Sequence, residues 1–148
     1  MKKVALGSDH AGYELKEFIK HWLEKEGYYV IDHGTDSAES VDYPDFALSV
    51  GKSVAAKEAD VGILICGTGI GMSIAANKLK GVRAALCLFP LMAELARRHN
   101  DANVIALGGR LMGKDLAVAT VKTFLNTIFD GGRHEVRVEK IKKLEGAE

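Results

Sequence analysis

The stretch that decides the fold is residues 61–79, VGILICGTGIGMSIAANKL. It begins with a near-continuous apolar run over residues 61–66, as expected for a parallel strand that is buried on both faces. A glycine loop follows at residues 67–71, and we expect a helix from 72 to 79. A strand, a glycine turn and a helix in this order are typical of the βαβ units that build a parallel sheet.

The same alternation continues on both sides of this stretch. We expect further strands at residues 4–7, 29–32, 82–88 and 104–107, and helices at 15–27, 44–57, 90–99, 115–129 and 133–143. The pattern predicts one domain over residues 1–148, a three-layer α/β/α sandwich around a five-stranded parallel, Rossmann-like sheet. By analogy with other doubly wound sheets we expect the strand order 2-1-3-4-5, with right-handed crossovers.

Composition narrows the functional class. The 20 basic and 20 acidic residues cancel, so no global field attracts nucleic acid or an anionic membrane. Cys66 and Cys87 are isolated and form no Cys/His ligand cluster, so no metal site is predicted. The opening residues MKKVALGSDH become polar too soon for a secretory signal, and we expect a cytoplasmic protein with reduced thiols.

The predicted site lies at the carboxyl ends of the strands. Open parallel sheets bind ligands there, at the point where the strand order reverses. In the expected order, strands 1 and 3 are neighbours at this point, so Asp9 and His10 should lie beside Cys66 and the loop 67–71. Arg110 follows the fifth strand and joins the candidates.

The loop 67–71, GTGIG, has a physical use beyond turning the chain. Its N–H groups and the following helix N-terminus can hold a phosphate or a developing enediolate oxygen. A dinucleotide fingerprint would need glycine where Met72 stands, and a Walker motif would need Gly-Lys-Ser/Thr, so we expect no cofactor. A merely tight turn between strand and helix remains the alternative.

Three further groups of residues are candidates on position alone. Cys66 ends a strand against a helix N-terminus, where a thiolate is favoured as nucleophile or base, although a buried structural cysteine is the alternative. His99 and Asn100 close a helix, where a histidine is also a favourable cap. Arg133 and Arg137 share one helix face and can clamp a phosphate, although a solvated charged face, which the nearby lysines also fit, is the usual explanation of such a pair.

Several long segments together carry a family resemblance: GSDHAGYELK, GTDSAESVDYPDFA, ILICGTGIGMSIAANK, RAALC, ARRHNDANVIALGGR and GGRHEVRVEKI. Over nearly its whole length the chain resembles the ribose-5-phosphate isomerase B family, which is closely related to galactose-6-phosphate isomerase subunits. The resemblance implies interconversion of D-ribose 5-phosphate and D-ribulose 5-phosphate through a cis-enediolate, a reaction of the pentose phosphate pathway that needs no metal or cofactor.

The resemblance also implies residue roles. Cys66 resembles the base that moves the proton between C2 and C1, with Thr68 beside it, and His99 resembles the group that opens the furanose ring, helped by Asp9. The residues that resemble binders of the substrate are Asp9, His10, Gly67, Thr68, Gly69, Ile70, Gly71, Asn100, Arg110, Arg133 and Arg137.

The family resemblance implies a homodimer whose active sites are shared between subunits, with a tetramer left open. The basic helix 133–143 would then pack at the dimer interface and reach the Cys66 pocket of the second copy. Two other functions stay open: isomerisation of a six-carbon sugar phosphate, such as allose or galactose 6-phosphate, and non-catalytic phosphate binding. A silent subunit of a heteromeric isomerase is disfavoured, because Cys66 is intact.

Overall fold

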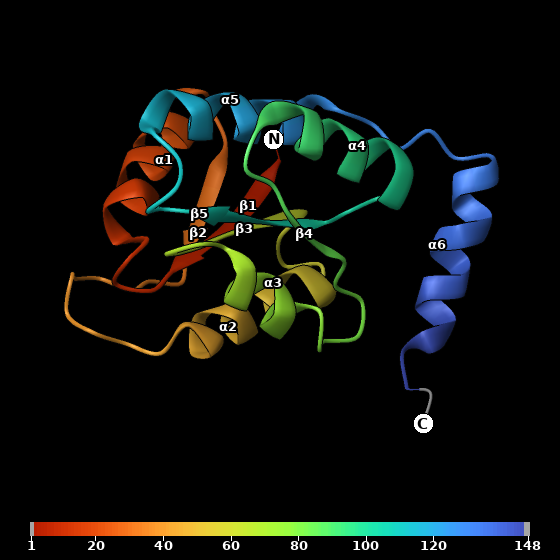
Figure 1. Cartoon of the computed structure of the whole chain (residues 1–148), viewed down its shortest axis with the longest axis horizontal. Coiled ribbons are helices and arrows are strands. Elements are labelled where there is room, and N and C mark those ends of the chain that lie inside the picture. Colours follow the sequence, from red (N-terminus) through yellow and green to blue (C-terminus); the bar gives the residue numbers. More distant parts are fainter. Residues whose placement is uncertain (1, 147–148) are drawn as a thin grey trace.

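Five strands alternate with helices along residues 2–146, which the computed structural model describes, and a sixth helix follows the fifth directly. The strands are β1 (Lys3–Ser8), β2 (Tyr29–Asp32), β3 (Val61–Cys66), β4 (Ala84–Leu86) and β5 (Val104–Gly108). The helices are α1 (Tyr13–Lys25), α2 (Tyr43–Ala55), α3 (Ile70–Ala76), α4 (Pro90–Asn100), α5 (Lys114–Asn126) and α6 (Arg133–Leu144). The predicted α/β class is therefore confirmed (Figure 1).

The strands form one parallel sheet in the order β2-β1-β3-β5-β4, so the predicted order 2-1-3-4-5 is wrong at one edge. β5 pairs with β3 and is fully buried, whereas β4 has only three half-buried residues and forms the edge. A short strand that buries little apolar surface suits an edge, while the apolar run of β5 suits the centre. The exchange places the end of β5 directly beside the end of β3.

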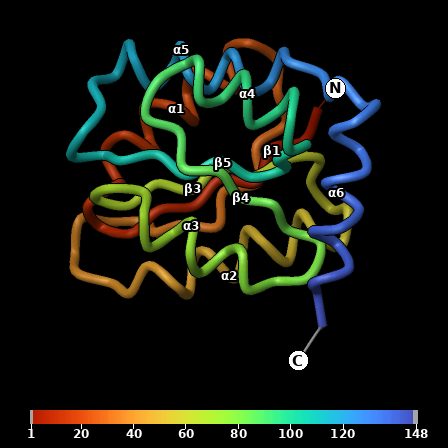
Figure 2. The backbone as a smooth tube through the Cα atoms, turned by 45° about the vertical axis from the view of Figure 1, so that its right-hand side comes forward, coloured from red at the N-terminus to blue at the C-terminus, as the bar shows by residue number. Residues whose placement is uncertain are grey.

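Helices cover both faces of the sheet (Figures 1 and 2). α1, α4 and α5 pack on one face, and α2 and α3 pack on the other. Each helix turns a regularly spaced apolar stripe inward, as Leu15, Ile19 and Leu23 of α1 illustrate. The two resulting cores confirm the expected three-layer sandwich.

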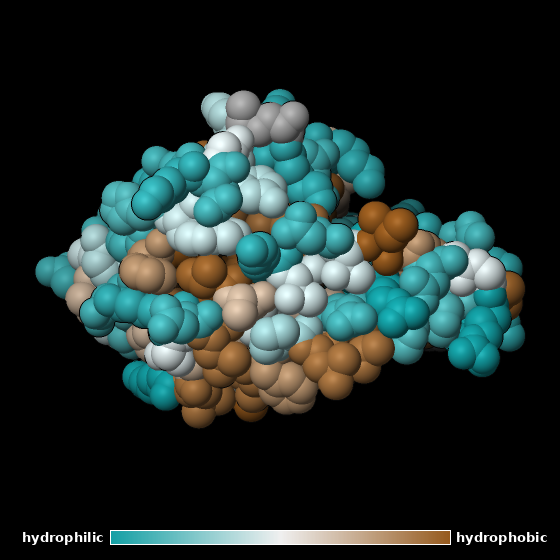
Figure 3. All heavy atoms as spheres, turned by 90° about the horizontal axis from the view of Figure 1, so that it is seen from above, coloured by the Kyte–Doolittle hydropathy of each residue, from teal (hydrophilic) through white to brown (hydrophobic). Residues whose placement is uncertain are grey.

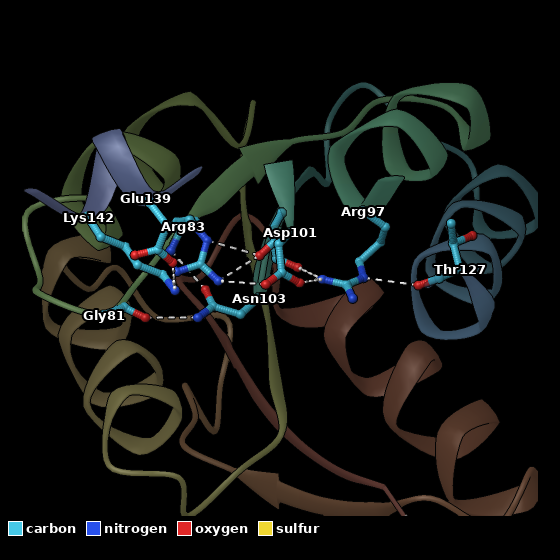
Figure 4. A network of polar contacts seen from close by, with 9 residues as sticks. Gly81, Arg83, Arg97, Asp101, Asn103, Thr127, Glu139 and Lys142 are labelled. Atoms are coloured by element: carbon cyan, nitrogen blue, oxygen red, sulfur yellow. Dashed lines mark hydrogen bonds and ion pairs between the residues drawn. The ribbon is translucent and has the colours of Figure 1, made fainter. Parts of the chain in front are cut away.

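A polar network fixes the carboxyl end of α4 against the amino ends of β4 and β5 (Figure 4). Arg83 donates through Nε and Nη2 to the Asp101 carbonyl oxygen at 3.0 and 2.9 Å. Arg97 donates through Nη1 to Asp101 Oδ1 at 2.9 Å and to the Ala102 carbonyl oxygen at 2.6 Å. Because Arg97 Nε also donates to the Thr127 carbonyl oxygen at 3.1 Å, one guanidinium ties α4 to the end of α5.

α6 stands outside the sandwich, beside the β4 edge (Figures 1 and 2). The sequence predicted a basic helix at 133–143, and the observed helix runs from Arg133 to Leu144. Only Val138 of this helix is buried, whereas Val136, Ile141 and Leu144 are exposed. No helix between residues 2 and 146 has both the length and the apolar character needed to cross a membrane.

Candidate active site

The sheet brings three of the predicted segments together at the carboxyl ends of β1, β3 and β5. Asp9 follows β1, and its backbone N–H donates to the Ile65 carbonyl oxygen of β3 at 3.2 Å. Gly109 follows β5, and its N–H donates to the Cys66 carbonyl oxygen at 2.8 Å. These bonds extend the sheet into its loops, so Asp9 and Cys66 are held by the backbone rather than by side-chain packing alone.

The Cys66 thiol lies at the end of β3, directly before the glycine loop 67–71. Cys66 is only 5% exposed, and its Sγ accepts the backbone N–H of Gly69 at 3.1 Å. Gly69 has φ 81°, and a Cβ there would lie 2.7 Å from a methyl group of Leu86, so the turn requires glycine. The N–H dipole stabilises negative charge on the sulfur. In contrast, burial raises the pKa of Cys87 to about 12, which leaves that thiol inert at neutral pH.

Two side chains pack directly on the loop glycines. A Cβ at Gly67 would lie 3.0 Å from Nη1 of Arg110, so this guanidinium rests on the loop as the sequence predicted. A Cβ at Gly71 would lie 2.6 Å from the ring of Tyr43. The sequence does not single out Tyr43, because its place in the motif GTDSAESVDYPDFA indicates only a helix that starts at Pro44.

Asp9 and His10 are both oriented by backbone amides. Asp9 is buried, and its Oδ1 accepts the N–H of Gly12 at 3.1 Å. The Nδ1 atom of His10 accepts the N–H of Val41 at 3.1 Å. Each side chain is therefore oriented by a hydrogen bond from the backbone of its own chain.

Four predicted residues are not brought to Cys66 within one chain. His99 and Asn100 end α4, and Arg133 and Arg137 lie in the first half of α6. A parallel βαβ connection returns to the amino edge of the sheet, so the end of α4 lies at the edge opposite to Cys66. The predicted site residues consequently fall into two separate groups within one chain, which we call half-sites.

The second half-site is centred on two stacked histidines. The rings of His99 and His134 lie 4.3 Å apart between centroids, with 11° between their planes. Together with Asp130 they offer ligand atoms within 4.8 Å of one another, which by composition suits a divalent cation. However, both carboxylate oxygens of Asp130 already accept Nε of Arg98 at 3.2 Å.

The electrostatics of this half-site favour an anion. Desolvation and the charges of His99, Arg133 and Arg137 hold the pKa of His134 below its ordinary value. Positive charge of this density disfavours a metal ion and favours a phosphate.

Fold and site together define a Rossmann-like α/β protein that carries a buried thiol and a glycine loop at the carboxyl edge of its sheet. The model of the Ribose/Galactose Isomerase family matches residues 4–141, so the chain belongs to that family. Ribose-5-phosphate isomerase B of Escherichia coli strain K12 is 51% identical over 98% of this chain and 97% of its own length.

Solved structures agree with this assignment. A ribose 5-phosphate isomerase from Thermotoga maritima is 60% identical, with a TM-score of 0.94 over 96% of this chain and 98% of its own. Ribose-5-phosphate isomerase B of Clostridium thermocellum is 56% identical, with a TM-score of 0.96 over 97% of both chains. The expected family and fold are thereby confirmed.

Proposed function

We propose that this protein, as a single domain over residues 1–148, interconverts D-ribose 5-phosphate and D-ribulose 5-phosphate in the pentose phosphate pathway. The observation that carries the proposal is the Cys66 thiol, which accepts the Gly69 N–H at 3.1 Å in a chain 51% identical to the Escherichia coli enzyme of that name. Both cysteines are free, which supports a cytoplasmic location.

The proposed chemistry is a proton transfer assisted by the loop and needs no cofactor. Cys66, as the thiolate, removes the proton from C2, the freed electron pair forms the C1–C2 double bond, and the electron pair of the C1 carbonyl moves to O1, which gives a cis-enediolate. The hydroxyl proton of O2 then passes to O1, the C2 carbonyl forms, and the C1–C2 electron pair takes the proton back from the Cys66 thiol at C1. Loop N–H groups, with Thr68 beside the thiol, stabilise the negative oxygen at no cost of reorganisation. His99, helped by Asp9, opens the furanose ring before this step.

We infer that the complete site forms in a homodimer. One edge of the sheet in each chain carries Cys66, Asp9, His10 and Arg110. A second copy would complete this site with residues from the opposite edge of its own sheet. The residues that this second copy would contribute are His99, Asn100, Arg133 and Arg137. Two half-sites of one reaction on opposite edges need a twofold pairing to meet.

The distribution of apolar side chains supports the dimer. Figure 3 shows hydrophobic side chains gathered along one rim of the molecule. The exposed large apolar residues of α3 and of the first half of α4 are Ile70, Ile74, Leu91 and Leu95. A hollow of about 720 Å³ lies between α6 and the β4 edge, and Asn100, Ile141 and Leu144 line it. A second copy would cover these surfaces and place α6 at the interface.

The phosphate then has donors from both copies. Arg110 and His10 approach it from the thiol side, while Arg133 and Arg137 approach from the second copy as a pair on one helix face. Guanidinium groups bind phosphate oxygens through paired N–H donors and fix the register of the sugar. This remote binding energy holds C1 and C2 against Cys66.

A six-carbon sugar phosphate is the second candidate substrate, because the matching family includes galactose isomerases. The test is kcat/KM for ribose 5-phosphate, allose 6-phosphate and galactose 6-phosphate, measured in EDTA. We expect the highest value with ribose 5-phosphate. A preference for either hexose phosphate would overturn the substrate, and phosphate binding without any turnover would overturn the isomerase proposal in favour of a binding module.

A further inference from the structure

The loop of residues 33–42 connects β2 to α2 and passes the first residues of the site. The sequence predicts only a polar loop here. In the structure the loop is fixed at both ends, at its start through Asp32 and at its end through a hydrogen bond from Val41 to His10.

Asp32 anchors the start of the loop. Its carboxylate accepts Nζ of Lys16 at 2.9 and 2.8 Å, Nζ of Lys20 at 3.0 Å and the N–H of Gly34 at 2.8 Å. Burial opposes ionisation, but the bonds from Lys16, Gly34 and Lys20 outweigh it and hold the pKa of Asp32 below its ordinary value. Because the Lys16 side chain is fully buried, the ion pair is shielded from solvent at one end.

The anchored residues then pair with the end of β1. The Ser8 N–H donates to the Gly34 carbonyl oxygen at 2.6 Å, and the Thr35 N–H donates to the Ser8 carbonyl oxygen at 2.8 Å. Ser8 directly precedes Asp9 and His10. The position of the loop and the position of these two site residues are therefore coupled through the backbone.

The far end of the loop determines the chemistry of the His10 ring. The Val41 N–H lies 3.1 Å from His10 Nδ1. A backbone amide only donates, so Nδ1 must accept and carries no hydrogen. A neutral imidazole that accepts at Nδ1 has its proton on Nε2. Among residues 2–146, the His10 ring makes this single hydrogen bond, so its Nε2–H group is available to a ligand.

We propose that the loop 33–42 is a positioning element that fixes His10 in the Nε2–H tautomer, so that His10 donates a hydrogen bond to an oxygen of the bound substrate. The inference rests on the proposed function for the identity of that substrate. Val41 acts through its backbone and Asp32 acts through the loop, so both are positioning residues and neither touches the substrate.

The test compares Val41→Pro, which removes the N–H donor, with Val41→Ala, which keeps it and shortens only the side chain. The tautomer of His10 is read in long-range ¹H–¹⁵N NMR spectra of the free protein, with signals assigned by loss in His10→Gln. We expect Nε2–H in the wild type and in Val41→Ala, and mixed tautomers in Val41→Pro. KM for ribose 5-phosphate should rise roughly three- to tenfold in Val41→Pro, the effect of losing one net hydrogen bond, with kcat changed less.

Two results would overturn the proposal. One is a wild-type spectrum in which His10 carries its proton on Nδ1, and this readout holds even where Val41→Pro does not fold. The other is a folded Val41→Pro protein whose His10 tautomer and KM match those of Val41→Ala. The NMR readout requires no turnover, so wild-type protein with the Nε2–H tautomer but no isomerase activity would refute the proposed function and leave the tautomer assignment standing.

Discussion

Mixing two inactive variants should restore activity if the active site is shared between chains. Cys66 ends β3 at the carboxyl edge of the sheet, while His99 ends α4 at the opposite edge. Cys66→Ala and His99→Gln therefore damage different half-sites of one chain. In a mixed dimer both defects fall in one active site, and the other site keeps an intact Cys66 and an intact His99.

The size of the recovery follows from counting sites. Random pairing of equal amounts makes half of the dimers mixed, so about one quarter of all sites are intact in a twofold dimer. The two variants, purified separately, should be nearly inactive with ribose 5-phosphate. After joint refolding the mixture should recover about a quarter of wild-type kcat, and an isolated mixed dimer should reach about half.

The control is joint refolding of Cys66→Ala with Cys66→Ser, whose mixed dimers have no intact site. Both variants must first be shown to form dimers by light scattering. Recovery no greater than in this control would refute the reasoning, because it would place Cys66 and His99 of the same chain in one site.

Three smaller perturbations test the fold around the site. Gly12→Ala should lower the free energy of unfolding by roughly 1–3 kcal/mol, because the added Cβ would overlap the Ile65 carbonyl oxygen. Gly113→Ala is the control, because a Cβ there meets open space. Equal urea midpoints for the two variants would contradict the prediction. In the folded protein the pKa of Asp32 lies below its ordinary value. The stabilisation by this carboxylate should therefore be present above the unfolded pKa of about 4 and be lost as the pH falls through the lower folded pKa. The urea midpoints of wild type and Asp32→Asn should converge in acid, and a constant difference between them would count against the ion pair. Cys87, whose pKa is raised to about 12, should resist iodoacetamide in the folded protein at pH 8, and mass spectrometry showing its rapid alkylation would disprove this.

The local pattern of the sequence predicts most elements well, because a strand buried on both faces of the sheet leaves a continuous apolar run in the sequence. The run 61–66 is the strand as observed, and the run 29–32 matches β2. The helix after the glycine loop was predicted at 72–79 but begins at Ile70 and ends at Ala76. A left-handed Gly69 starts it early, a backbone state that composition does not reveal.

Strand order depends on long-range pairing, which a local pattern does not encode. β4 and β5 both read as apolar runs, and only the sheet shows that β4 is the edge. The separation of His99 from Cys66 could have been found from topology alone, because a helix between parallel strands ends at the amino edge. The contact between Val41 and His10 joins residues whose sequence pattern gives no signal of pairing.

The central claim is that Cys66 is the base of a metal-independent isomerase. Its most direct test is the turnover of ribose 5-phosphate in EDTA by Cys66→Ala, with Cys87→Ala, which removes the other buried thiol just after β4, as the matched control. Loss of a positioned base should lower kcat by roughly 10²–10⁴-fold in Cys66→Ala, while Cys87→Ala keeps its turnover wherever it folds. Turnover by Cys66→Ala within a few fold of wild type would contradict the account and assign the proton transfer to another residue.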